Sequence, residues 1–262
     1  MLQKGVTRMV RHAWRATVLS ILLLGSAWTA SALGITKDFD QKYPLQPGGT
    51  FELQNVNGTV EVQGWDRNEV EVHAVKTAKQ RESDLERVSI DVTAKPGGIS
   101  VSTRYPQDEG VEVAVEYTIH VPHGADLQHL TTVNGGLKVS EVDNIEELRT
   151  VNGNIEVFEG GGPVRAHTTN GNIRIELPRA RRIGALTAET MNGSLLLAIP
   201  SDTQAELETR CLNGSFSSEL PISMESTAAP REMHGRLGHG GASIRLRTVN
   251  GAIRIVTYRS TV

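Results

Sequence analysis

Histidines that lie close together in the sequence are the first candidates for metal or acid–base chemistry, because neutral imidazole binds metals and titrates near neutral pH. Two such groups occur: His120, His123 and His129 form one, and His234 and His239 form the other. The pair is spaced by five residues without carboxylate or cysteine companions. The group of three suits the solvated end of a strand. The sequence therefore predicts no metal site and no cofactor.

Acidic clusters are the second candidates, since paired carboxylates carry out general acid–base catalysis. Glu82, Asp84 and Glu86 stand together, but Arg81 and Arg87 alternate with them as on a solvated face. The chain also lacks the G-x-S-x-G, H-E-x-x-H and G-x-x-x-x-G-K signatures. We predict no catalytic residues and a protein that is not an enzyme. The alternative is a polysaccharide lyase or hydrolase on a β-helix scaffold.

A repeat sets the elements that must position any site. The dipeptide Asn-Gly occurs seven times, and the four central steps between copies are 18, 18, 22 and 21 residues long. The pairs are Asn57-Gly58, Asn134-Gly135, Asn152-Gly153, Asn170-Gly171, Asn192-Gly193, Asn213-Gly214 and Asn250-Gly251. One Asn-Gly is a weak turn signal, but seven with matching flanks are a strong repeat.

Apolar and polar residues alternate on both sides of each pair, which predicts two half-buried strands per unit. The unit could be a tight hairpin or one coil of a solenoid. A period near 20 residues favours the second. We therefore predict an all-β fold, a single-stranded β-solenoid with coils of about 18–22 residues. In it, Gly supplies a positive φ at each corner, and the asparagine amides stack along the axis.

When the seven Asn-Gly units are aligned on one another, the single cysteine and four arginines fall at defined positions of the unit. Because Cys211 is the single cysteine, an internal disulfide is excluded. Cys211 occupies a position that Thr fills in most other units. It is either a reactive thiol or a small, buried and inert side chain, and the alignment favours the second. Arg149, Arg174, Arg247 and Arg254 fall at outward positions and form a possible binding face.

One position breaks the alternation. The residue before Asn is apolar in six of the seven units: Val56, Val133, Val151, Met191, Leu212 and Val249. We call this row the corner stripe. Strict alternation turns it outward, where it could dock a partner or mediate oligomerisation; corner geometry or a coil connection could instead cover it.

The regions around the regular repeats differ from them. Residues 33–125 carry longer alternating runs between turn clusters, which predicts an N-terminal part with wider rungs, or a β-rich cap for one end of the solenoid. Residues 126–262 contain the coils. Residues 221–241 interrupt them with proline and several glycines, which predicts a loop insertion.

The first 32 residues predict a signal peptide. They contain four basic residues, a short apolar run and the small-residue sequence Ala30-Ser31-Ala32. The remaining residues, 33–262, include 23 basic and 30 acidic side chains, a balance that argues against nucleic-acid binding. We expect an exported protein, periplasmic or extracellular, with no transmembrane anchor after cleavage.

The segment from Asn55 to Asp66, NVNGTVEVQGWD, and the recurring V-N-G-x-I-x-V units resemble a bacterial putative-adhesin family of envelope proteins, a domain of unknown function. The resemblance covers roughly Phe39 to Val256. It implies a β-solenoid and supplies no catalytic residues. The expected function is an exported, non-enzymatic envelope protein, an adhesin or binding module for an unknown protein or glycan. A structural or signalling envelope protein is a second alternative to the enzyme.

Overall fold

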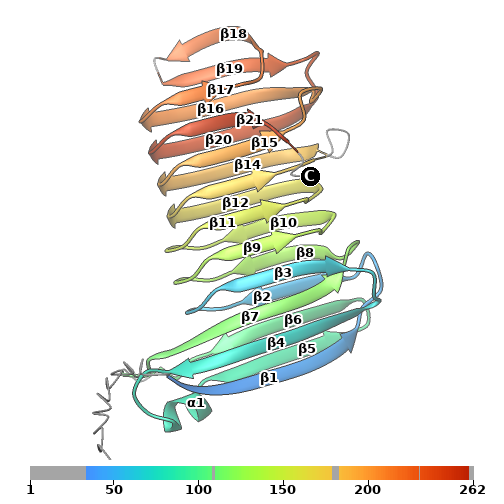
Figure 1. Ribbon diagram of the computed structural model, residues 1–262, viewed down its shortest axis with the longest axis vertical. Helices are drawn as coiled ribbons and strands as arrows, with labels where there is room; N and C mark the ends of the chain where they lie inside the picture. Colours follow the sequence, from blue (N-terminus) through green and yellow to red (C-terminus); the bar gives the residue numbers. More distant parts are fainter. Residues whose placement is uncertain (1–33, 108–109, 179–182, 230, 260–262) are drawn as a thin grey trace, which may run out of the picture. The chain divides into compact units, whose positions relative to one another are not determined.

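The computed structural model describes residues 34–107, 110–178, 183–229 and 231–259. The predicted signal peptide lies outside these residues. The described chain forms two facing β-sheets and one short helix (Figure 1). This all-β architecture confirms the predicted fold class. Within the described residues, no helix is long and apolar enough to cross a membrane.

Among the described residues, sheet A has ten strands and sheet B has eleven. Sheet A runs in the order β1 (Ile35–Pro44), β4 (Glu69–Ala78), β7 (Val113–Pro122), β3 (Val60–Trp65), β9 (Leu137–Ser140), β11 (Ile155–Phe158), β13 (Ile173–Glu176), β15 (Leu195–Ile199), β21 (Ile253–Thr257), β17 (Phe216–Ser218). Sheet B runs in the order β18 (Ile222–Ala229), β19 (Glu232–Leu237), β16 (Ala205–Asn213), β20 (Ala242–Asn250), β14 (Ile183–Asn192), β12 (Gly162–Asn170), β10 (Asn144–Arg149), β8 (Asp126–Thr131), β2 (Thr50–Gln54), β6 (Gly98–Arg104), β5 (Ser89–Lys95).

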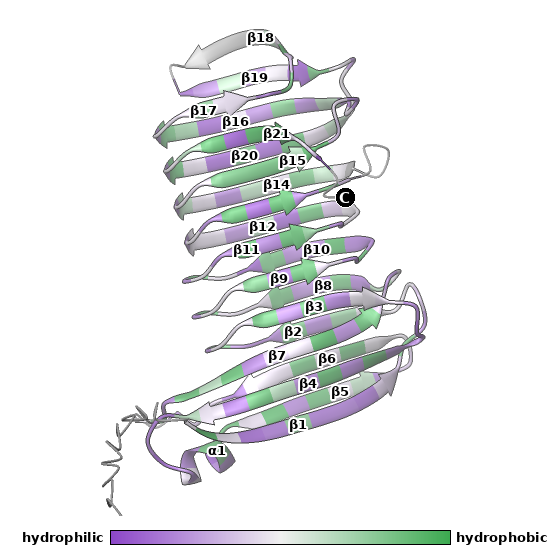
Figure 2. Cartoon of the chain, viewed as in Figure 1, coloured by the Kyte–Doolittle hydropathy of each residue, from purple (hydrophilic) through white to green (hydrophobic). Residues whose placement is uncertain are grey.

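Each Asn-Gly unit contributes one strand to each sheet, and equivalent strands of neighbouring coils pair in parallel. Ile155 on β11 pairs with Leu137 and Ile173, the residues that the alignment makes equivalent. Alternate side chains therefore point between the sheets, where aliphatic residues form one continuous buried core. The alternation of apolar and polar residues is visible along the strands (Figure 2). The packing follows directly from the period-two pattern.

The order of coils in space differs from their order in the sequence. The C-terminal coil, β20–β21, lies between β14–β15 and β16–β17, so the last coil of the chain is inserted within the stack (Figure 1). At the other end, β2–β3 lies between β6–β7 and β8–β9. Every corner offers the same backbone and asparagine groups, so any coil can stack on any other, and the repeat pattern leaves the order open.

The expected loop insertion at residues 221–241 is wrong. Most of it forms the strands β18 and β19, a hairpin that continues sheet B beyond β16 with antiparallel pairing. Of the residues that suggested a loop, Gly238, Gly240 and Gly241 lie in the turn before β20, Gly235 lies within β19, and Pro230 is outside the described residues. Turn residues mark a hairpin as readily as they mark a loop, which is why the composition alone misled.

The opposite end of the stack is closed by antiparallel strands and the helix. β1, β4 and β7 pair antiparallel in sheet A, and β5 pairs antiparallel with β6 in sheet B. The helix α1 (Ser83–Arg87) packs beside β4, with Leu85 buried. The Lys76 ammonium donates to the carbonyl oxygens of Leu85, at 2.6 Å, and Val88, at 3.0 Å, which holds the helix in place. Burial lowers the pKa of Lys76.

Candidate functional site

The seven repeat asparagines form one continuous ladder along a single corner of the stack. In each step the Nδ2 of one asparagine donates to the Oδ1 of its neighbour. The six bonds, each 2.7–2.9 Å long, follow the spatial order Asn57, Asn134, Asn152, Asn170, Asn192, Asn250, Asn213. Because each interior amide both donates and accepts within the row, the ladder fixes the position of every corner.

The close contact between neighbouring coils leaves no room for a side chain at the residue after each asparagine. A Cβ on Gly153 would lie 1.9 Å from the carbonyl oxygen of Gly135, and one on Gly171 would lie equally close to that of Gly153. The predicted reason, a positive φ at every corner, holds only for Gly58 and Gly251. The other five corner glycines lie outside the left-handed region. Close approach of successive coils, rather than backbone handedness, is what excludes a side chain.

A second ladder runs inside the corner, two residues before each asparagine. The hydroxyl of Thr168 donates to the carbonyl oxygen of Gly153 at 3.0 Å, and Thr132, Thr150, Thr190 and Thr248 make the same contact with their own neighbouring coils. Cys211 occupies this row, with its Sγ 3.2 Å from the Gly251 oxygen. Burial raises the pKa of the Cys211 thiol, which disfavours the reactive thiolate. The cysteine therefore takes the place of a threonine.

The corner stripe is not buried. Val133, Val151 and Met191 are 39%, 38% and 50% exposed, and the remaining three members are half-buried. Thr169, in the equivalent position of its own coil, interrupts the row. Near the end of the stripe, Met191, Leu212 and Val249 line an apolar hollow of about 240 Å³, with Arg210 and Arg247 among its polar neighbours. The stripe is thus an accessible apolar edge beside the asparagine ladder.

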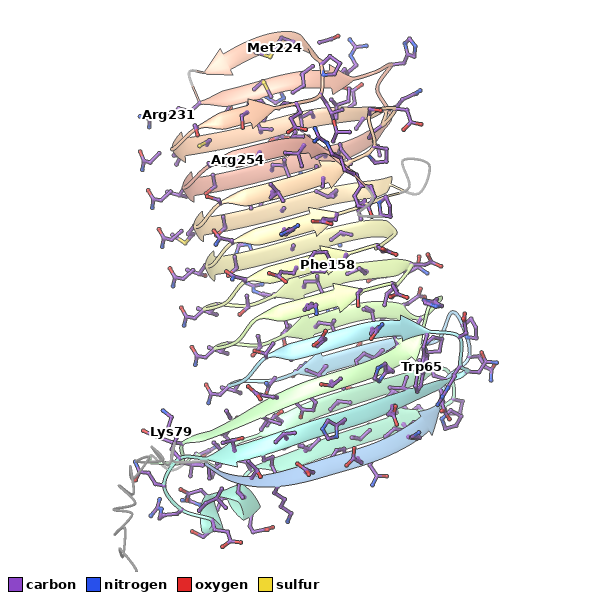
Figure 3. The ribbon with its side chains drawn as sticks, in the orientation of Figure 1. Trp65, Lys79, Phe158, Met224, Arg231 and Arg254 are labelled. Carbon is purple, nitrogen blue, oxygen red and sulfur yellow. The ribbon has the colours of Figure 1, made fainter. Side chains whose placement is uncertain are left out.

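The four predicted arginines do not form one face. Arg149 and Arg247 lie on β10 and β20 of sheet B, whereas Arg174 and Arg254 lie on β13 and β21 of sheet A. Outward side chains of two facing sheets point in opposite directions, so the arginines divide into two pairs. Arg254 is labelled on sheet A in Figure 3. The alignment identified outward positions but could not tell which strands shared a sheet.

The two pairs also differ in their ionic partners. Arg247 donates to Glu208 at 2.5 Å and lies 3.7 Å from Glu189, and Arg174 lies 2.5 Å from Glu176. Arg149 and Arg254 are exposed, and neither has an ion-pair partner among the described residues. Of the four predicted arginines, these two are available to a ligand, one on each sheet.

Outward charges elsewhere are largely paired between strands. Lys138 donates to Glu61 at 2.6 Å across β9 and β3, and this bond raises the pKa of the lysine. Glu208 accepts from both Arg245 and Arg247, and the bond from Arg247 is the main cause of the lowered pKa of this carboxyl. Both groups are therefore held in their charged forms.

A shallow depression on sheet A involves two of the predicted arginines. It has a volume of about 480 Å³ and lies between Arg174 and Arg254, with Leu196 between them on β15. Asn172 and Ser194 line it from the corner side. Its lining combines the two arginines with the Glu156 carboxylate, two asparagine amides, the Ser194 hydroxyl and four apolar residues, a mixed composition suited to a polar ligand.

The histidines do not converge. His123 lies 2.6 Å from the carbonyl oxygen of Glu141, and His129 lies 3.0 Å from Glu147, each on its own. His120 stacks on the Trp65 ring at 5.0 Å, and the Arg67 guanidinium lies 4.7 Å from the same ring (Figure 3). Within the described residues, no three His, Cys, Asp or Glu side chains are placed to share a metal ion. Sequence reasoning missed the Trp65 cluster, because the pairing of β3 with β7 is non-local.

The sequence profile of the Toastrack DUF4097 family matches residues 50–256. The chain belongs to this family. The match spans every Asn-Gly coil, and it confirms the family resemblance expected from the repeated V-N-G units. DUF4097 is a domain of unknown function, so the family assigns no role to these ladders or faces. No curated protein matches the chain.

Several solved structures resemble this DUF4097 chain weakly. One, from Clostridium sporogenes, is described as a putative cell adhesion protein; it is 12% identical with a TM-score of 0.43, over 85% of this chain and 100% of the other. A putative adhesin from Bacteroides fragilis is 12% identical with a TM-score of 0.38, over 85% and 97%. A putative lipid binding protein from Parabacteroides distasonis is 10% identical with a TM-score of 0.37, over 86% and 98%.

Proposed function

We propose that this DUF4097 chain is an exported, non-enzymatic binding module of the cell envelope, with a protein or glycan ligand. The basic and apolar leader with its Ala-Ser-Ala sequence supports export. The repeat architecture supports binding, because stacked coils present the same outward positions at regular intervals along an extended surface.

The observation that carries the proposal is the asparagine ladder. Its six amide bonds fix the corner that holds the exposed corner stripe, and the parallel register aligns the outward residues of both sheets. A surface held rigid before binding loses little conformational entropy when a ligand docks. The coils therefore present these side chains on a backbone that needs no further ordering: the exposed Val151 and Met191, and the cations Arg149 and Arg254.

The charge arrangement supports binding over catalysis. A general acid needs a carboxyl whose pKa is raised toward neutrality. Here the pKa values of Glu71 and Glu208 are lowered, chiefly by hydrogen bonds from Lys42 and Arg247. Such carboxylates stabilise the surface and stay ionised, which suits a recognition face.

A binding screen with one variant for each surface tests the proposal. The purified protein is applied to a glycan array and to intact envelopes, beside Arg254→Glu for sheet A, Arg149→Glu for sheet B and Val151→Glu for the corner stripe. These residues are exposed, so the variants should fold normally, which circular dichroism checks. Loss of binding in one variant identifies the surface. Failure of the wild-type protein to bind any glycan or envelope contradicts the proposal.

A further inference from the structure

The two sheets end at different levels at the end of the stack formed by β16 and β17. Sheet A ends at β17, whereas sheet B continues past β16 with β19 and then β18 (Figure 1). Because β16 and β17 belong to one coil, the hairpin β18–β19 has no described strand opposite it in sheet A. The end of the stack is therefore a step, with a two-strand overhang on one sheet and a two-strand gap on the other.

The inner face of the overhang is apolar and incompletely covered. Ile222 pairs with Leu237, and Leu237 is buried against the core, so this face of the hairpin points inward. Met224 lies two residues further along the same face and is 59% exposed (Figure 3). Met233 on β19 is half-buried. Ile253, an inward residue of the coil β20–β21 further into the stack, is fully buried, because strands of both sheets cover it. The hairpin has no described strand opposite it and lacks this second layer.

The strand that borders the gap is open to pairing. Among the described strands, β17 pairs with β21 alone, and its inward residues Phe216 and Ser218 are half-buried. Its sequence, Phe-Ser-Ser, contains no charge or proline. Charged side chains on an edge strand discourage the addition of another strand. β1, the edge strand of sheet A at the other end of the stack, carries four such residues: Lys37, Asp38, Asp40 and Lys42.

We propose that a second copy of this chain fills the step and forms a symmetric dimer. A two-fold axis parallel to the strands, midway between the sheets, exchanges the position of sheet A with that of sheet B. The overhang of each copy then enters the gap of the other, and β18 of one copy lies beside β17 of its partner. Two strands fill a two-strand gap on both sides, so the interface closes with two copies.

The strand directions fit this arrangement. β18 and β16 both run antiparallel to β19, so they run parallel to each other. β17 runs opposite to β16, because the Asn213-Gly214 corner reverses the chain. The axis preserves strand direction, so β18 of one copy and β17 of the other pair antiparallel, the pattern that hairpin edges readily accept.

The size of the step favours a dimer over docking through the corner stripe. From strand spacing and rise, the inner face of the overhang and the two newly paired edges total about 600 Å² on each copy. Specific interfaces bury about 1,200–2,000 Å² in total over both partners, so the step, at about 600 Å² on each copy, reaches the lower end of that range. The corner stripe is one side chain wide over seven coils, or about 200 Å², which is too little for a dimer on its own. The inference goes beyond the proposed function and stands whether or not a ligand binds.

Sedimentation equilibrium of the full purified chain tests the dimer, with Met224→Glu as the disrupting variant and Met191→Glu as its matched control. Symmetry places two substituted Met224 side chains in one interface, so Met224→Glu should raise the dimer dissociation constant about a hundredfold. Met191→Glu, on the corner stripe, should leave it unchanged. Both methionines are at least half exposed in the single chain, so neither variant should unfold it, as circular dichroism will show.

Cross-linking tests the orientation. Ser217 and Ser223 face outward on opposite sheets of one copy. The dimer places Ser217 of one copy and Ser223 of the other on adjacent strands, about 10 Å apart along the strand direction. In a Cys211→Thr background, a mixture of Ser217→Cys and Ser223→Cys proteins should be joined by a bismaleimide whose spacer spans that offset, whereas Ser217→Cys alone should not. A chain that is monomeric at all concentrations, or a dimer that survives Met224→Glu or dissociates with Met191→Glu, would overturn the proposal.

Discussion

Replacing a corner glycine should open the stack between two coils. In Gly171→Ala the new Cβ would lie 1.9 Å from the carbonyl oxygen of Gly153. Non-bonded heavy atoms approach to roughly 3.5 Å, so the two corners must separate by about 1.5 Å. The φ of Gly171 lies outside the left-handed region, so the effect of the substitution comes from this contact alone.

The magnitude follows from the bonds that cross the same corner. Gly153 N–H donates to the Asn170 oxygen at 3.0 Å, Thr168 donates to the Gly153 oxygen at 3.0 Å, and Asn170 donates to Asn152 at 2.8 Å. A separation of this size breaks all three. At about 1 kcal/mol net for each bond, the free energy of unfolding should fall by about 3 kcal/mol.

Urea unfolding followed by circular dichroism measures the change, and Gly136→Ala is the matched control. A Cβ on Gly136 would meet its nearest heavy atom, the Asn154 oxygen, at 3.4 Å, which is an ordinary contact. The control should change the free energy of unfolding by less than about 1 kcal/mol, with either sign. If Gly171→Ala is no more destabilising than Gly136→Ala, the close-approach explanation of the corner glycines is refuted.

Three further predictions concern the ladders and the ion pairs. Asn170→Ala removes two amide bonds and Asn213→Ala only one, so urea unfolding should show a loss of about 1–2 kcal/mol for the first and half of that for the second; equal losses would contradict a continuous ladder. The folded-state pKa of Glu208 is lowered, so its contribution is present above its unfolded pKa of about 4.3 and is lost as the pH falls. Glu208→Gln should thus destabilise at pH 7, and its difference from the wild-type protein should shrink as the pH falls through the folded-state pKa; a pH-independent difference would count against the Arg247 pairing. Cys211→Thr should change stability by less than about 1 kcal/mol, and the native thiol should react with a thiol reagent much more slowly than the unfolded one; fast native labelling would revive the reactive-thiol interpretation.

The sequence predicted the coils because their information is local. Alternation around Asn-Gly defines which side chains turn inward, and parallel register then follows from stacking equivalent residues. The Thr row with its single cysteine was visible in the alignment for the same reason. The positive φ predicted for every corner glycine is wrong at five of the seven corners. The true reason for glycine is a contact between two coils, which the sequence of one unit does not reveal.

Non-local features could not be predicted. The insertion of β20–β21 between two earlier coils depends on which identical corners meet, and the alignment does not distinguish them. The division of Arg149 and Arg254 between two sheets, and the step beside β17, follow from topology in the same way. The repeat pattern predicted which arginines lie at outward positions, but which of them share a sheet required the structure.

Binding of the labelled protein to intact envelopes is the measurement that tests the central claim most directly. A binding module with preformed surfaces predicts a saturable isotherm that excess unlabelled protein displaces, and the predicted loss of binding in one of the three surface variants. A linear, undisplaced signal that Arg254→Glu, Arg149→Glu and Val151→Glu all leave unchanged would contradict it.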